Sequence, residues 1–256
     1  MATLAGAHGE RVRLARALLS SKGRKEQQRF AFEGPTLLAE AARTGAQLFE
    51  IFATRDAYDR EPAVRELEAS GVPVYIVDER TAEKLSDVDT PSGIVTVAPA
   101  RYARLEVALS SRLSLVLAGI SDPGNAGTLL RSAEAFGAQG VVFGSAGVEP
   151  YHPKVVRAAM GAVFRLALVV AEPQAVEAAA RDLGVEVLGL DARGEDIRDV
   201  RRAERTTLIV GHERRGLGPW AGVCTRRVAI PMNGPTESLN AAVAGSIALY
   251  ALTPGA

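Results

Sequence analysis

Short apolar segments of strand length alternate with segments of helical periodicity along almost the whole chain. The segments with strand character are 30–34, 48–54, 72–78, 93–98, 114–120, 139–144, 165–170, 185–191, 201–211 and 226–232. The segments with helical character are 11–19, 35–45, 63–71, 80–88, 126–137, 155–164, 175–184 and 237–252. This alternation predicts an α/β fold, in which helices cover the faces of sheets.

The alternation is interrupted between residues 99 and 111, where the apolar positions lose their periodicity. We therefore predict a smaller N-terminal α/β domain over 1–98, a linker over 99–111 and a second α/β domain over 112–256. A length of 256 residues allows two domains of ordinary size. Within the first domain, the polar stretch 20–28 is predicted to form a turn.

The first of three unusual loops follows the strand at 114–120 and has the sequence SDPGNAG. Its glycines allow a tight turn and a close approach of the backbone to a ligand. Asn125 is placed to cap the following helix, and Arg131 lies almost two turns further along it. An ordinary strand-to-helix turn with a surface arginine has the same features, so this loop alone does not decide between the two interpretations.

The second loop follows the strand at 201–211, which ends in Gly211. Glu213 comes directly after it, and ligands of α/β sheets bind at the carboxyl ends of the strands. Glu213 is therefore a candidate site residue. Arg214 and Arg215 are equally compatible with a charged surface turn, and we interpret the neighbouring histidine as a loop residue rather than a base.

The third loop follows the strand at 226–232 and leads into the last predicted helix, which begins with the sequence ESLN. That helix is rich in small residues, namely Ala241, Ala242, Ala244, Gly245, Ser246 and Ala248. Small side chains let another backbone approach closely. The approaching backbone belongs either to a second chain or to a neighbouring element of the same domain.

Charge is balanced over the chain but not at its start. The formal net charge is +0, so any contact with nucleic acid has to come from a local patch. Residues 1–30 contain seven basic and two acidic side chains. We predict that Lys22, Arg24, Lys25 and Arg29 in this region bind RNA phosphates. A solvated helix face followed by a loop is the alternative interpretation.

Several classes of site and location are disfavoured by the sequence. It contains neither a G-x-G-x-x-G loop after the first strand of either half nor a G-x-x-x-x-G-K-[ST] loop, and no G-x-S-x-G nucleophile turn. One cysteine and three scattered histidines give no metal centre. No apolar run is long enough for a membrane span or a signal core, so we expect a cytoplasmic protein with no membrane contact.

Taken together, the three loops resemble the signature motifs of the SpoU (TrmH-like) family of RNA methyltransferases, a branch of the SPOUT superfamily. The matching residues are Asn125, Gly127 and Arg131 for N-x-G-x-x-x-R, Gly211, Glu213, Gly216 and Leu217 for G-x-E-x-x-G-L, and Ile230, Pro231, Met232, Ser238, Leu239 and Asn240 for I-P-M…S-L-N. Each motif alone is a weak pattern, but three in this order, each at a strand end, are specific. The resemblance is strong over 112–253, and residues 22–34 resemble the opening of the substrate-binding domain of ribosomal-RNA members.

The resemblance implies a fold, a cofactor and an assembly. The catalytic domain would be a SPOUT α/β domain with its C-terminal segment threaded into a deep trefoil knot, and the N-terminal domain would resemble ribosomal-protein folds. The cofactor would be S-adenosylmethionine, bound by Gly211, Ile230, Met232, Ser238 and Leu239. The protein would be a homodimer through the catalytic domain, which would give the small residues of the last helix a use.

The implied reaction is transfer of a methyl group to a ribose 2′-hydroxyl, with 23S ribosomal RNA as the favoured substrate. Arg131 matches the family residue implicated in activating the hydroxyl, but a guanidinium stays protonated in proteins. We therefore expect it to stabilise the developing oxyanion and to hold a phosphate. Asn125 would orient the substrate or Arg131, and Ser238 would contact the ligand or the arginine. Glu213 and Asn240 would support the site.

Three other functions remain open at this point. The chain could methylate transfer RNA, act as a non-catalytic RNA-binding or ribosome-assembly factor, or be a nucleotide-dependent oxidoreductase. The complete motif set argues against a non-catalytic factor, and the missing glycine fingerprint argues against an oxidoreductase. The N-terminal domain favours ribosomal over transfer RNA by family analogy alone.

Overall fold

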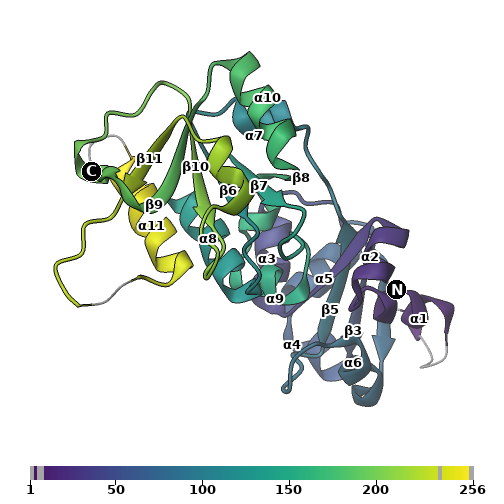
Figure 1. The fold of residues 1–256 in the computed structure, drawn as a ribbon. Helices are drawn as coiled ribbons and strands as arrows, with labels where there is room; N and C mark the ends of the chain where they lie inside the picture. The colour runs from purple at the N-terminus through teal and green to yellow at the C-terminus, as the bar shows by residue number, and fades with distance from the viewer. Residues whose placement is uncertain (1–2, 5–8, 236–237, 254–256) are drawn as a thin grey trace. The chain divides into compact units, whose positions relative to one another are not determined.

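A computed structural model describes residues 3–4, 9–235 and 238–253 of the chain (Figure 1). These residues form helices that pack against two separate sheets, which confirms the predicted α/β class. Glu237, where the last helix was predicted to begin, lies outside the described residues. The described part of that helix begins at Ala241.

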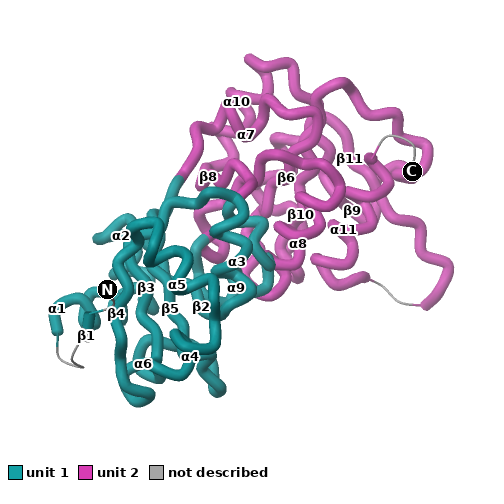
Figure 2. The backbone as a smooth tube through the Cα atoms, turned by 180° about the vertical axis from the view of Figure 1, so that it is seen from behind, with its two compact units in different colours: residues 1–101, 151–164 teal, residues 102–150, 165–256 magenta. Residues whose placement is uncertain are grey.

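The chain divides into two compact units (Figure 2). Unit 1 comprises residues 1–101 and 151–164, and unit 2 comprises residues 102–150 and 165–256. The predicted division at 98 and 112 differs from these units in two respects. The predicted linker contains a helix with buried residues that packs within unit 2, and a segment of the predicted second domain belongs to unit 1.

Unit 1 contains a mixed five-stranded sheet in the order β1-β4-β3-β5-β2. Its strands are β1 (Thr3–Leu4), β2 (Arg29–Glu33), β3 (Glu50–Thr54), β4 (Val74–Val77) and β5 (Ile94–Pro99). Its helices are α1 (Glu10–Ala17), α2 (Ser21–Gln27), α3 (Pro35–Arg43), α4 (Arg55–Arg60), α5 (Pro62–Ala69), α6 (Glu79–Leu85), α9 (Pro153–Ala158) and the 3-10 turn η1 (Ala162–Phe164). The β3–β4 pair is parallel, whereas β5 runs antiparallel to both β3 and β2.

Residues 151–164 join unit 1 through an aromatic cluster. The ring of Tyr151 stacks on that of Phe30 with centroids 4.5 Å apart, and the Phe164 ring meets Phe32 edge-on at 5.2 Å. Arg157 on α9 also donates two hydrogen bonds to the carboxylate of Asp87, at 2.8 and 2.9 Å. Large aromatic contacts of this kind dominate the burial of apolar surface, so the segment is part of the core of unit 1.

The polar stretch predicted to be a turn is helix α2 instead. The hydroxyl of Ser20 accepts a hydrogen bond from the Gly23 N–H, which satisfies one free donor at the start of the helix. Gly23 lets α2 pack tightly on α1, because a Cβ at this position would stand 2.0 Å from the carbonyl oxygen of Ala17. Cap and close packing therefore stabilise a helix that the apolar pattern does not show.

The four predicted RNA-binding residues of this region differ in their exposure to solvent. Arg24 is wrong as an RNA contact, because it is 5% exposed and donates to the carbonyls of Leu18 and Leu19 at 2.9 and 3.1 Å. Lys22 and Lys25 lie exposed on α2. Arg29 is half-buried, and its guanidinium lies 4.2 Å from the centre of the Phe49 ring.

Unit 2 contains a six-stranded sheet in the order β11-β9-β10-β6-β7-β8, and all its strand pairs are parallel. The strands are β6 (Leu113–Ala118), β7 (Gly140–Gly144), β8 (Ala167–Ala171), β9 (Glu186–Asp196), β10 (Thr206–Gly211) and β11 (Arg226–Ala229). The helices are α7 (Leu105–Leu109), α8 (Pro123–Ala135), α10 (Pro173–Leu183), α11 (Ala241–Ala251) and the 3-10 turns η2 (Ile197–Asp199) and η3 (Gly218–Gly222). Strands β6 and β7 are buried along their whole length, as expected for a parallel sheet covered on both faces.

Helix α11 uses its small residues inside unit 2. It packs against α8 and β10, and a Cβ at Gly245 would stand 2.4 Å from the Leu129 side chain. The hydroxyls of Ser132 on α8 and Ser246 on α11 are 2.7 Å apart. Of the two uses that the sequence left open for these residues, close packing within the domain is the one observed.

We predict that Arg24→Ala destabilises the chain, because two carbonyl groups lose a charged donor in a buried position. The expected loss is about 2–3 kcal/mol of the free energy of unfolding, measured by urea denaturation. Lys25→Ala, on the same helix but exposed, is the matched control and should stay within about 0.5 kcal/mol of wild type. Equal stability of the two variants would contradict the structural role of Arg24.

Candidate active site

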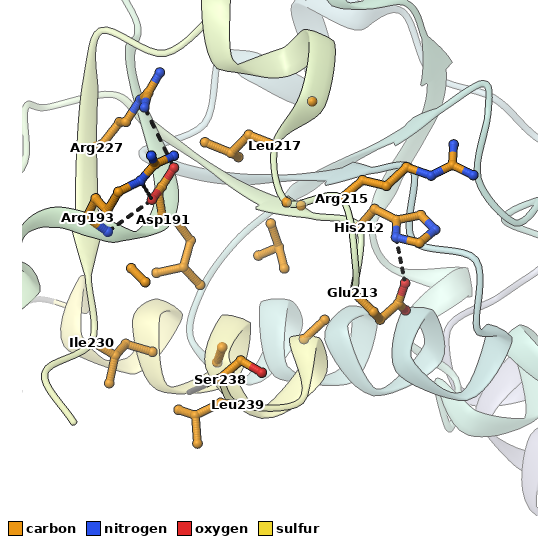
Figure 3. Close-up of a pocket in the computed structure, with 18 of the residues that line it drawn as sticks. Asp191, Arg193, His212, Glu213, Arg215, Leu217, Arg227, Ile230, Ser238 and Leu239 are labelled. Atoms are coloured by element: carbon orange, nitrogen blue, oxygen red, sulfur yellow. Dashed lines mark hydrogen bonds and ion pairs between the residues drawn. The ribbon is translucent and has the colours of Figure 1, made fainter. Parts of the chain in front are cut away.

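A cavity of about 430 Å³ opens at the carboxyl ends of β9, β10 and β11 (Figure 3). This is the edge at which parallel α/β sheets bind their ligands. All the predicted cofactor-binding residues line it, namely Gly211, Ile230, Met232, Ser238 and Leu239. Segments from the second and third motifs thus meet around one space.

The loop after β10 is closed by its own backbone. The N–H of His212 donates to the Gly216 carbonyl and the N–H of Gly216 donates back, each at 2.9 Å. Gly216 has a φ of +59°, and a Cβ on Gly211 would stand 2.4 Å from the Gly216 backbone. Both positions therefore require glycine. The tight loop fixes Glu213 at the rim of the cavity.

Side-chain hydrogen bonds join residues from all three motif loops. The amide nitrogen of Asn125 donates to a carboxylate oxygen of Glu213 at 3.1 Å. The amide nitrogen of Asn240 donates to the Asn125 side-chain oxygen, also at 3.1 Å. The side-chain oxygen of Asn240 in turn accepts the N–H groups of Ala242 and Val243 and so caps α11. We call Asn125, Glu213 and Asn240 the bridging network.

The cap of α8 is not Asn125, as the sequence suggested, but Asp122. A carboxylate oxygen of Asp122 accepts the Asn125 N–H at 2.7 Å, and Pro123 occupies the first helical position. Because Asp122 serves as the cap, the side chain of Asn125 is left available to bond Glu213 and Asn240.

The Glu213 carboxylate is held in its ionised form. Partial burial raises its pKa, but hydrogen bonds from its own backbone N–H and from the Asn125 amide act in the opposite direction. The neighbouring His212 adds to the lowering, and its imidazole nitrogen lies 3.7 Å from the carboxylate. The net pKa of Glu213 is below its usual value, so a negative charge stands beside the cavity at neutral pH.

The other two predicted catalytic residues have different positions. Ser238 lines the cavity and is exposed. Arg131 is exposed on α8, and it belongs neither to the described residues that line the cavity nor to the bridging network. Arg131 therefore shares helix α8 with Asn125 of the bridging network, but in this single chain it does not reach the cavity.

Sequence analysis missed a second charged group at the cavity. Asp191, Arg193 and Arg227 line the side opposite Glu213 (Figure 3). A signal for Asp191 was present, since it follows the apolar part of the strand at 185–191 just as Glu213 follows the next strand. Asp191 belongs to none of the three motifs, so the sequence did not mark it as a site residue.

The sequence predicts neither a metal site nor a membrane span, and both features can be sought in the described part of the chain. There, no group of three or more His, Cys, Asp or Glu side chains is arranged to hold a metal ion. The same residues include no helix with the length and apolar character needed to cross a bilayer.

A profile of the SpoU rRNA methylase family matches residues 112–250, which comprise most of unit 2 together with the segment 151–164 of unit 1. The chain belongs to the SpoU family. An MRM3-like substrate-binding domain matches residues 9–96 of this SpoU protein.

Relatives of this SpoU protein align with most or nearly all of the chain. A 23S rRNA (guanosine(2553)-2′-O)-methyltransferase of Bacillus subtilis is 29% identical over 98% of this chain and 99% of its own length. A 23S rRNA (adenosine(1067)-2′-O)-methyltransferase of Streptomyces laurentii is 32% identical over 83% of this chain and 81% of its own. The similarity thus includes both units.

Solved structures agree over both units as well. An AdoMet-bound rRNA methyltransferase from Sinorhizobium meliloti superposes with a TM-score of 0.86 at 27% identity, covering 98% of this chain and 97% of its own. The SpoU methyltransferase AviRb from Streptomyces viridochromogenes, in complex with the cofactor AdoMet, gives 0.85 at 27% identity and covers 96% and 97%. The fold of this chain is therefore that of SPOUT methyltransferases.

We predict that Asn125→Ala raises the pKa of Glu213, because the carboxylate loses its amide donor. The measurement is a pH titration of the ¹³C-labelled glutamate carboxyl by NMR. Ser121→Ala is the matched control, because its hydroxyl lies at a longer 3.5 Å from the other carboxylate oxygen and should matter less. A Glu213 pKa that does not move in Asn125→Ala would contradict the bridging network.

Proposed function

We propose that this chain is an S-adenosylmethionine-dependent RNA 2′-O-ribose methyltransferase that acts on 23S ribosomal RNA in the cytoplasm. The observation on which the proposal rests is the bridging network, which joins the three SpoU motif loops at the rim of one cavity. The 23S ribosomal RNA methyltransferases among the relatives support the substrate. Transfer RNA is the less favoured alternative.

The cavity suits S-adenosylmethionine in size and chemistry. A volume of about 430 Å³ lies in the range of small-molecule sites. Val210, Leu217, Ile230 and Leu239 supply apolar walls for a purine, and Gly211 also lines the cavity. The charged side chains on both sides suit a ligand with polar ends. When bound, the cofactor supplies a methyl group that is already activated on a sulfonium sulfur.

The residues of the chain position the reactants and stabilise charge. Because its pKa is low, Glu213 remains a carboxylate that fixes Asn125, and Asn240 fixes the other end of the same amide. Such pre-organised groups lower the barrier chiefly by orientation. Arg131, a permanent cation, is assigned to the developing oxyanion and to a substrate phosphate. Ser238 contacts the ligand from the cavity wall.

The RNA would contact unit 1 through exposed cations of α2. Lys22 and Lys25 are the two predicted residues that remain well exposed, and Lys22 has only an exposed pair with Glu26 at 3.8 Å. Exposed pairs of this kind are weak, so a phosphate can compete for the ammonium group. Arg29 adds a guanidinium beside an aromatic ring, while Arg24 is excluded by its burial.

The chain is further proposed to form a homodimer through α11. The buried side of this helix faces α8 and β10, yet its opposite side presents Val243, Ile247 and Tyr250 at 49%, 40% and 55% exposure. A helix that is apolar on both sides is normally covered on both sides. Tyr250 on this exposed face contacts Phe136 at the C-terminal end of α8, the helix that carries Arg131, so a second copy bound here would lie next to that helix.

We predict that Arg131→Ala loses methyl transfer by about 100-fold or more and keeps its affinity for S-adenosylmethionine. The two measurements are incorporation of tritiated methyl groups into ribosomal RNA and titration calorimetry. Arg181→Ala is the control, because Arg181 is an exposed helix arginine of the same unit that pairs only with Glu177 on its own helix. Near-normal turnover of Arg131→Ala would remove this residue from the chemistry. Cofactor binding without any transfer by the wild type would favour the non-catalytic factor.

We predict that Ile247→Glu converts the dimer to a monomer, since a carboxylate would have to be buried in an apolar contact. Sedimentation velocity over a range of concentrations measures the change. Val107→Glu is the matched control, because Val107 is 56% exposed on α7 of the same unit. A monomeric wild type, or a dimer that persists in Ile247→Glu, would contradict the assignment of this face.

A further inference from the structure

The ion-paired group formed by Asp191, Arg193 and Arg227 has no role in the proposed reaction. Its members line the side of the cavity opposite Glu213 (Figure 3). A carboxylate oxygen of Asp191 accepts the backbone N–H of Arg193 at 3.0 Å, and the Arg193 side chain lies 3.5 Å from the same oxygen. The other oxygen lies 3.7 Å from the Arg227 guanidinium. The carboxylate is thus oriented by Arg193 on its own strand β9 and by Arg227 on β11.

Within this group the carboxylate lies deeper than the arginines. The Asp191 side chain is 18% exposed, against 85% for Arg193 and 46% for Arg227. The pKa of Asp191 is lowered, chiefly by the Arg193 N–H, so the group is ionised at neutral pH. A carboxylate accepts about four hydrogen bonds, and the two guanidinium separations exceed normal hydrogen-bond lengths. Asp191 therefore keeps acceptor capacity for a ligand in the cavity.

The net charge of the ion-paired group determines which hydrogen-bond donors of a ligand can lie next to it. One carboxylate and two guanidiniums give a net positive charge, which disfavours a cationic ammonium or sulfonium group nearby. Neutral hydroxyl donors do not meet this repulsion. In a nucleoside these are the ribose hydroxyls, and an acidic side chain that accepts from them is a recurrent solution in dinucleotide sites.

We propose that Asp191 is a specificity-determining residue that accepts hydrogen bonds from the ribose hydroxyls of the cofactor. The inference rests on the proposed function, because it assumes an adenosyl ligand in this cavity. Arg193 and Arg227 act through Asp191 as positioning residues that keep the carboxylate ionised and oriented.

Titration calorimetry with ligands that lack one part at a time tests this role. The ligands are S-adenosylhomocysteine, 5′-methylthioadenosine, which has no amino-acid part, and its 2′,3′-dideoxy derivative. Asp191→Ala is expected to bind the first two about 10-fold to 100-fold more weakly than wild type. It should bind the dideoxy derivative as wild type does, because the hydroxyls that Asp191 contacts are missing.

Two further variants keep the result interpretable. Asp191→Asn retains an acceptor for the Arg193 N–H and therefore the local geometry of β9, so a weaker affinity in this variant is not a folding defect. Glu195→Ala is the matched control, since Glu195 is on the same strand, pairs with Arg226 and does not line the cavity. Its affinities should equal those of wild type.

The outcomes separate this inference from the proposed function. If the Asp191 variants lose affinity for S-adenosylhomocysteine but not for 5′-methylthioadenosine, the group binds the amino-acid end and the inference is overturned. Unchanged affinities for every ligand overturn it as well. A wild-type chain that binds neither S-adenosylmethionine nor S-adenosylhomocysteine contradicts the proposed function itself.

Discussion

The hydrogen bonds among Asn125, Glu213 and Asn240 are the interactions on which the candidate site depends. They connect side chains that are 88 and 115 residues apart in the chain, and each partner lies at the start of a helix or just beyond a strand. The carboxylate accepts from one amide, which accepts from the next, whose own oxygen caps α11. Replacing any of the three side chains removes at least one of these hydrogen bonds. The Asn240 side chain therefore serves both the candidate site, through its nitrogen, and the cap of α11, through its oxygen.

Much of this fold could be predicted from periodicity, and the exceptions have physical reasons. The alternation of strands and helices predicted the α/β class of both units, but not that the sheet of unit 2 is parallel and that of unit 1 is mixed. Helix α2 was missed because its stability comes from the Ser20 cap and from the close contact at Gly23, which no apolar pattern records. Helix α7 was missed because five residues are too few to show a period.

For the site, sequence motifs were informative about which loops meet but not about what each side chain does. Glu213 could be singled out by its place after a strand. That Asp122 rather than Asn125 caps α8, and that the Asn125 side chain bonds Glu213 instead, follows only from the structure. Asp191 stands at the same sheet edge but in no motif. The trefoil knot, the homodimer and the individual cofactor contacts remain predictions, since they depend on chain threading, a second copy and a ligand.

The placement of residues 151–164 in unit 1 limits how this protein can evolve by recombination. The chain leaves unit 1 after residue 101, returns to it at 151 and leaves again after 164, so unit 1 is not a detachable module. A recombination event at a single junction would separate Tyr151 and Phe164 from the rings of Phe30 and Phe32. The two units are thereby constrained to be inherited together, since a new unit 1 would need a unit 2 that carries the matching segment 151–164.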